Sequence, residues 1–142
     1  MDTNYTLDET AQIAHALLES TTVQTETATV IGLSGDLGAG KTTLVQAMAR
    51  ELGVVEQVVS PTFVIAKFYE TTDARFHRLI HVDAYRIEQE SELDTLGWHR
   101  MLSIPQTLIV VEWPERVVAS LPASTRMLRI SHAHDQRHIL EV

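Results

Sequence analysis

The apolar positions along the chain recur at two spacings, one typical of helices and the other of strands. Residues 7–18 carry apolar side chains three or four positions apart, and residues 41–52 do so before Gly53, a residue type that often ends helices. Residues 29–34 and 107–112 are short aliphatic runs, which are typical of strands buried on both faces. Further strands are predicted at 62–70, 76–83, 126–131 and 137–142, and a second helical region at 89–101.

This order of strands and helices predicts an α/β domain. Strands that follow one another directly in the middle of the chain indicate a mixed sheet rather than a purely parallel one. A length of 142 residues predicts a single domain spanning 1–142, because it matches the size of one ordinary hydrophobic core.

The composition excludes several kinds of protein. The chain has no cysteine, so disulfides, thiolate metal sites and cysteine nucleophiles are ruled out. Its longest apolar runs are about five residues, against the ~20 that a membrane span requires. Residues 1–10 are polar and acidic, unlike a secretory signal. We therefore expect a soluble, cytoplasmic protein that does not contact membranes.

The charge argues against direct binding of nucleic acid. Nineteen acidic residues outnumber eleven basic ones, and the net charge is −8. Binding of naked nucleic acid by release of counterions requires a basic surface. Any nucleic acid in the biology of this protein is therefore expected to be held by a partner.

The strongest chemical signal is the segment GDLGAGKT at residues 35–42, which fits the phosphate-loop pattern G-x-x-x-x-G-K-S/T. Glycines let the backbone curl so that successive N–H groups point at an anion. Lys41 would then meet the β- and γ-phosphates, the Thr42 hydroxyl would reach Mg²⁺, and the dipole of the following helix would add positive potential. The predicted strand before this segment and the predicted helix after it agree with a phosphate loop.

Such a loop needs a carboxylate at the end of a neighbouring strand to hold the magnesium shell. Glu112 directly follows Leu108–Val111, the arrangement of a Walker B strand, and Asp83 follows Leu79–Val82 in the same way. Both acids are candidates from the sequence.

A second candidate element is SPTF at residues 60–63, about twenty residues after Lys41. Nucleotide switches often place a threonine at this distance, where it senses the γ-phosphate and the metal, so Thr62 is a candidate. A plain proline turn before a strand explains the same residues equally well. The N-K-x-D element that selects guanine is absent, which favours ATP over GTP.

Five segments together resemble the TsaE family, small bacterial ATPases that take part in making threonylcarbamoyladenosine on transfer RNA. They are GDLGAGKTTL at 35–44, SPTF at 60–63, HVDAYR at 81–86, ELDTLGW at 92–98 and VEWPER at 111–116. Many proteins share the glycine motif alone, whereas this ordered set is specific. The resemblance covers roughly residues 5–122, and no motif is recognised after about residue 123.

The resemblance implies a P-loop NTPase-type domain of three layers, with a mixed central sheet flanked by helices. It implies that Thr42 and Glu112 hold Mg²⁺, and that Asp83 lies near the γ-phosphate. Lys41, Asp83 and the switch threonine Thr62 are then the expected catalytic residues. The residues expected to bind ATP are Thr10, near the adenine, and Asp36, Leu37, Gly38, Ala39, Gly40, Lys41, Thr42 and Thr43.

The family also implies a partner. Its members do not make the modification; they hydrolyse ATP while docked on the TsaD–TsaB transferase pair, which sustains the turnover of that complex. We therefore expect an Mg²⁺-dependent ATPase that is slow alone, is stimulated by such a complex, and meets transfer RNA only through it.

Two other functions stay open. A P-loop small-molecule kinase would need an arginine-rich lid over its second substrate, and Arg75, Arg78 and Arg86 are instead spread along the predicted strands. A non-catalytic, nucleotide-gated binding module would bind ATP without releasing phosphate.

Overall fold

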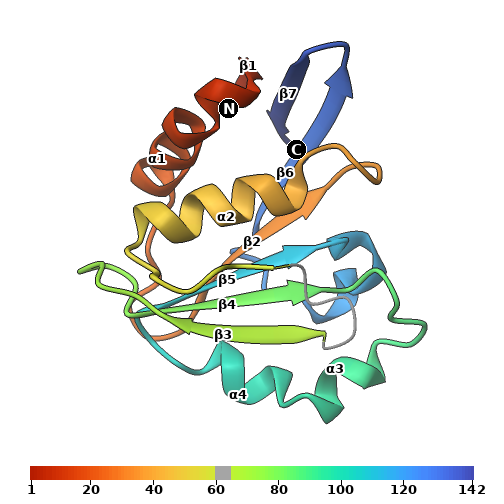
Figure 1. Ribbon diagram of the computed structural model, residues 1–142. Helices are drawn as coiled ribbons and strands as arrows, with labels where there is room; N and C mark the ends of the chain where they lie inside the picture. The colour runs from red at the N-terminus through yellow and green to blue at the C-terminus, as the bar shows by residue number, and fades with distance from the viewer. Residues whose placement is uncertain (60–64) are drawn as a thin grey trace.

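The computed structural model describes residues 1–59 and 65–142 (Figure 1). These residues form one sheet of seven strands in the order β1-β7-β6-β2-β5-β4-β3. The four central strands β6, β2, β5 and β4 are parallel, and the three outer pairings are antiparallel. The predicted mixed sheet is thus confirmed. The strands are β1 (Asp2–Thr6), β2 (Thr29–Ser34), β3 (Ala66–Glu70), β4 (Arg78–Asp83), β5 (Thr107–Glu112), β6 (Arg126–Ala133) and β7 (Gln136–Glu141).

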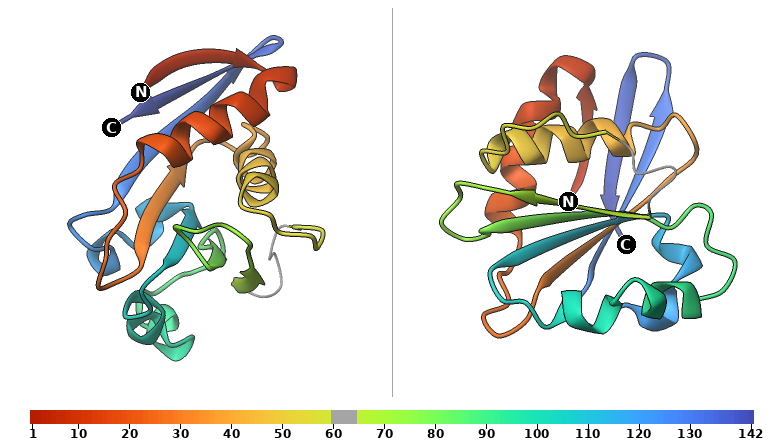
Figure 2. Two further views of the ribbon diagram at one scale, coloured as in Figure 1. Left: turned by 90° about the vertical axis from the view of Figure 1, so that its left-hand side faces the viewer. Right: turned by 60° about the horizontal axis from the view of Figure 1, so that its bottom comes forward.

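Helices cover both faces of the sheet, as the views in Figure 2 show. Helices α1 (Thr10–Ser20) and α2 (Lys41–Glu51) lie on one face, and the short helices α3 (Ser91–Thr95) and α4 (Trp98–Leu102) lie on the other. Single 3-10 turns, η1, η2 and η3, occur at Leu7–Glu9, Pro114–Arg116 and Val118–Ser120. The structure therefore has the expected three layers of an α/β fold of the P-loop NTPase type.

The central strands are aliphatic throughout because each contributes side chains to two cores. In β2, Ile31 packs towards α1 and α2, whereas Val30 packs towards α3 and α4. In β5, Leu108 packs towards α1 and α2, whereas Ile109 packs towards α3 and α4. Every residue of this strand is buried. The run at 107–112 therefore indicated a strand covered on both sides, and that prediction is confirmed.

The N-terminal segment departs from the prediction. Strand β1 was not predicted, because only Tyr5 of its five residues is buried and its sequence is otherwise polar. The apolar face predicted over 7–18 consisted of Leu7, Ala11, Ala14, Leu17 and Leu18. It is partly wrong, because Leu7 and Ala11 are exposed and Ile13 is buried. Glu9 closes this turn, because its carboxylate accepts the N–H and the hydroxyl of Thr6, both at 2.9 Å.

Gly97 divides the predicted helical region 89–101 into two short helices. Its backbone is left-handed, with φ of +83°, at the start of α4. The turn directs Trp98 into the core, where it is fully buried and its Nε1–H donates to the carbonyl of Ser120 at 2.9 Å. Among the described residues, no helix has the length and apolar character needed to cross a membrane.

Gly35, directly after β2, offers a test of how tightly the following loop is built. Its φ is +144°, and an added Cβ would lie 2.3 Å from the carbonyl oxygen of Ile130. Gly35→Ala should destabilise the protein by about 3 kcal/mol, since backbone strain adds to a clash with main chain. Chemical denaturation measures this loss.

Gly38→Ala is the matched control for that substitution. Gly38 also has a positive φ, +78°, but an added Cβ would meet nothing within 4 Å among the described residues. Gly38→Ala should therefore lower the free energy of unfolding by only about 1 kcal/mol. Equal losses of stability in the two variants would contradict the close approach at Gly35.

Candidate active site

The glycine loop, residues 35–42, joins the C-terminal end of β2 to the N-terminal end of α2. Gly38 and Gly40 have positive φ values of +78° and +106°, and Gly40 is the residue that caps α2. Helix α2 begins at Lys41, and its first N–H groups and its dipole point towards the loop. The strand and the helix predicted on either side of the glycine loop are therefore present.

Lys41 is folded back against the loop. Its Nζ donates to the carbonyl of Gly35, and to that of Asp36 at 2.9 Å. The ammonium also lies 4.3 Å from the ring centroid of Trp113, and only 5% of the residue is exposed. Burial lowers the pKa of Lys41 below its usual value, and nearby carboxylates, first that of Glu112, oppose this shift. A bound polyphosphate would favour the charged ammonium further.

The two candidate carboxylates stand side by side at the ends of adjacent parallel strands. Asp83 ends β4 and Glu112 ends β5, and the two are register partners. The hydroxyl of Thr42 donates to Glu112, with distances of 3.0 Å to Oε2 and 3.2 Å to Oε1. Asp83 Oδ1 accepts the backbone N–H of Tyr85 at 3.0 Å. The sheet register therefore brings together acids that are 29 positions apart in the sequence.

These donors suit Mg²⁺. The Thr42 hydroxyl and the two carboxylates offer hard oxygen ligands. Nowhere in residues 1–59 and 65–142 do three His, Cys, Asp or Glu side chains gather as a metal site. Mg²⁺ is usually held by one or two carboxylates together with waters and substrate phosphates, so this small donor set fits it better than a fully protein-bound metal.

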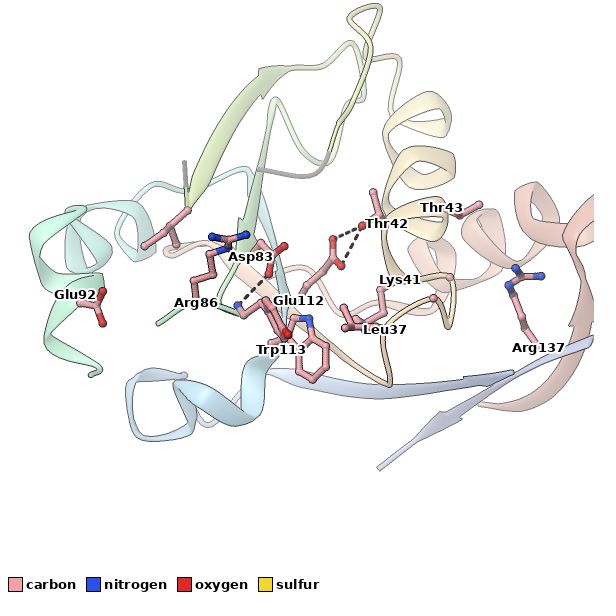
Figure 3. A pocket seen from close by; sticks show the side chains of 14 residues that line it. Leu37, Lys41, Thr42, Thr43, Asp83, Arg86, Glu92, Glu112, Trp113 and Arg137 are labelled. Atoms are coloured by element: carbon pink, nitrogen blue, oxygen red, sulfur yellow. Dashed lines mark hydrogen bonds between the residues drawn. The ribbon is translucent and has the colours of Figure 1, made fainter. Parts of the chain in front are cut away.

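A cavity of about 500 Å³ opens in front of these groups (Figure 3). In the figure, Lys41 and Thr42 reach into it from the α2 side, and Asp83, Arg86 and Trp113 lie across from them. The lining residues are Leu37, Gly38, Gly40, Lys41, Thr42, Thr43, Ile65, Asp83, Tyr85, Arg86, Glu92, Glu112, Trp113 and Arg137. Its size suits a small-molecule ligand such as a nucleotide.

Most of the residues predicted from the sequence line this cavity, and the others are placed as follows. Asp36 and Ala39 belong to the loop but are not among the lining residues. Thr10 begins α1, where its hydroxyl donates to the carbonyl of Leu7 at 2.7 Å, and it is also not among them. The predicted adenine contact of Thr10 stays a prediction. Thr62 lies outside the described residues, so its role as a switch threonine stays a prediction as well.

The structure adds residues that sequence reasoning did not place in the site. Trp113 has a left-handed backbone, with φ of +60°, and its ring lies 5.0 Å from that of Tyr85. Arg137 reaches the loop from β7, where its Nε would lie 2.6 Å from a Cβ added at Gly40. The position of Trp113 next to Glu112 was a signal in the sequence, whereas no motif marked Arg137.

Comparisons with known proteins agree on one family. The sequence profile described as "Threonylcarbamoyl adenosine biosynthesis protein TsaE" matches residues 5–139. A Streptomyces coelicolor protein named "tRNA threonylcarbamoyladenosine biosynthesis protein TsaE" is 42% identical over 105 residues, which are 73% of this chain and 69% of that protein. A Haemophilus influenzae protein of the same name is 32% identical over 117 residues, which are 82% and 72% of the two chains.

The matches cover only part of the length of each curated relative, and one solved structure has a similar fold. This chain spans from 54% to 72% of the lengths of such curated relatives. The crystal structure of Bacillus subtilis YdiB has a TM-score of 0.72 and 26% sequence identity to this chain, covering 99% of this chain and 83% of that one.

Proposed function

This chain belongs to the TsaE family of tRNA threonylcarbamoyladenosine biosynthesis proteins, and we propose that it acts there as an Mg²⁺-dependent ATPase. The observation that carries the proposal is convergence: Lys41, Thr42, Asp83 and Glu112 come from α2, β4 and β5, and all line one cavity. This is the set of groups that phosphoryl transfer requires, namely a phosphate-binding loop with its lysine, a hydroxyl and carboxylates for the metal.

The loop and Lys41 would bind the phosphates. The glycine backbone and the N-terminal end of α2 offer N–H groups and positive potential to an anion. To reach a phosphate oxygen, Lys41 exchanges its two carbonyl partners, Gly35 and Asp36, for the negatively charged ligand. A phosphate oxygen carries a full negative charge and a carbonyl oxygen only a partial one, so the Coulomb attraction to the ammonium favours the exchange.

Thr42 and Glu112 would hold Mg²⁺, and Asp83 would orient the attacking water or the metal shell. When bound, the metal would neutralise charge that develops on the phosphate oxygens. Arg86 and Arg137 also line the cavity, so they can add positive charge around the phosphates. Thr62 is proposed as the residue that senses the γ-phosphate.

We further propose that a TsaD–TsaB-like transferase complex is the partner and that it stimulates a slow intrinsic hydrolysis. The resemblance described above supports this partner. A group supplied by a partner can accelerate phosphoryl transfer by about 10³–10⁵-fold, which makes a slow isolated ATPase physically reasonable.

The test is phosphate release from ATP by the isolated protein, with and without Mg²⁺, and again with a TsaD–TsaB complex. We expect slow, Mg²⁺-dependent release that rises when the complex is added. Phosphoryl transfer to a metabolite, detected by thin-layer chromatography, would contradict the ATPase proposal and support the kinase alternative. Tight ATP binding without phosphate release, even with the complex present, would identify a binding module.

Free transfer RNA should bind negligibly to the isolated protein at physiological salt. The net charge of −8 opposes binding to a polyanion. Filter binding at moderate salt measures this, and retention of RNA only after the transferase complex is added would agree with an indirect role. Association of micromolar strength or tighter, falling steeply with added salt, would contradict it.

A further inference from the structure

His81 is a buried polar side chain that the functional assignment above does not use. It lies in the middle of β4, between Ile80 and Val82, and it is fully buried. Strand alternation places it on the same face as Leu79, which packs in the core beneath α1 and α2. Its Nε2 lies 2.5 Å from Oε2 of Glu112.

Packing alone does not account for a histidine here. The neighbouring core positions of β4 are aliphatic, and an imidazole must keep its hydrogen bonds when it leaves water. Its second nitrogen, Nδ1, has no hydrogen-bond partner among the described residues. A buried polar atom without a partner costs about 1–3 kcal/mol, so this position carries a cost that an aliphatic residue would not.

We propose that His81 is a positioning residue for the Glu112 carboxylate, an inference that rests on the proposed ATPase function. A carboxylate only accepts hydrogen bonds, so the short contact assigns the proton to Nε2 of His81. Oε2 of Glu112 then receives two donors, His81 Nε2–H and the Thr42 hydroxyl. These two donors come from different elements, β4 and α2, and together they fix the direction in which the carboxylate faces.

The orientation matters because of the neighbouring ammonium. Glu112 is the carboxylate with the largest influence on Lys41, so the two charges attract each other. Without the donor from β4, the carboxylate is free to turn towards Lys41 and away from Thr42. Hydrogen-bonding partners of metal-binding carboxylates typically change metal affinity by about 10–100-fold.

The test compares His81→Leu, which removes the donor, with His81→Gln, which keeps an N–H at similar reach. ADP affinity is measured by calorimetry without Mg²⁺ and across a titration of MgCl₂. We expect the Mg²⁺ concentration that gives half of the full change in ADP affinity to rise about 10–100-fold in His81→Leu. In His81→Gln it should return part of the way to the wild-type value. Affinity for ADP without Mg²⁺ should change much less than the Mg²⁺ dependence, because the hydrogen bond of His81 among the described residues goes to Glu112 and not to the phosphate loop.

Val110→Ala is the matched control, since Val110 is the fully buried register partner of His81 on β5 and carries no polar group. It should leave the Mg²⁺ dependence unchanged. An equal shift in Val110→Ala and His81→Leu would overturn the proposal, as would unchanged Mg²⁺ dependence in His81→Leu. The two proposals fail in different ways. Absence of any Mg²⁺ effect on ADP binding in the wild type would contradict the ATPase proposal, whereas an Mg²⁺ effect that is the same in the wild type and in His81→Leu would contradict only the role of His81.

A second measurement needs no variant of His81 and no metal. In the ¹⁵N–¹H NMR spectrum of the metal-free wild type, Nε2 of His81 should carry a slowly exchanging, downfield proton that moves upfield in Glu112→Gln. Finding Nε2 without a proton would overturn the proposal even if His81→Leu does not fold.

Discussion

Replacement of Lys41 by alanine is expected to lower ATP turnover by at least about 10²-fold, since it removes a buried cation from the position where phosphate charge would develop in the proposed reaction. Among the described residues, the ammonium faces the ring of Trp113 and donates to the carbonyls of Gly35 and Asp36, and all three of these groups belong to the site rather than to the hydrophobic core. The fold should therefore persist. Phosphate release and thermal unfolding, measured on the same preparation, test both parts.

Lys41→Met is the matched variant, because it keeps most of the side-chain volume and removes the charge together with the N–H donors. It should lose activity to the same extent as the alanine variant while disturbing the packing around Trp113 less. Normal hydrolysis in either variant, or marked unfolding of Lys41→Met, would show that Lys41 is not the phosphate lysine.

Glu112→Ala and Asp83→Ala should both impair hydrolysis, but by different routes. The contact of Glu112 with the Thr42 hydroxyl makes it the expected magnesium ligand, so its loss should weaken Mg²⁺-dependent ATP binding by about 10-fold or more. Asp83 is its neighbour in register but accepts the N–H of Tyr85. Its loss should spare binding and lower kcat by about 10²-fold.

Titration of Mg²⁺ against nucleotide affinity in each variant distinguishes the two roles. Glu112→Gln and Asp83→Asn are the matched controls, since they keep the shape of each side chain and remove the negative charge. Identical metal dependence in the wild type and in Glu112→Ala would refute the assignment of Glu112. A change in metal affinity for Asp83→Ala, with kcat unchanged, would exchange the two roles.

The accuracy of the sequence-based predictions followed the strength of the local pattern. The aliphatic run 107–112 and the helix before Gly53 were placed correctly, because burial on two faces and a left-handed helix end both leave local signals. Strand β1 left no such signal. It forms because its backbone pairs with β7, and that contribution does not depend on apolar side chains.

The start of α1 shows the same distinction at the level of single residues. Asp8 and Thr10 both belong to the residue types that commonly cap the start of a helix. The structure instead uses Glu9 to bind back to Thr6, while the Thr10 hydroxyl bonds to Leu7. Several residues near a helix end can satisfy the same free backbone groups, and only the path of the chain selects among them.

The sequence by itself determined the glycine loop, its lysine and threonine, and the two candidate strand-end acids. These are local features, because a tight turn needs glycines and because the lysine and the threonine lie next to it in the chain. The tertiary structure decided which groups surround the loop. Parallel register set Asp83 beside Glu112, β4 delivered His81 to the same carboxylate, and the antiparallel hairpin of β6 and β7 brought Arg137 against Gly40. Contacts between residues so far apart in the chain depend on strand order and register, which no local spacing encodes.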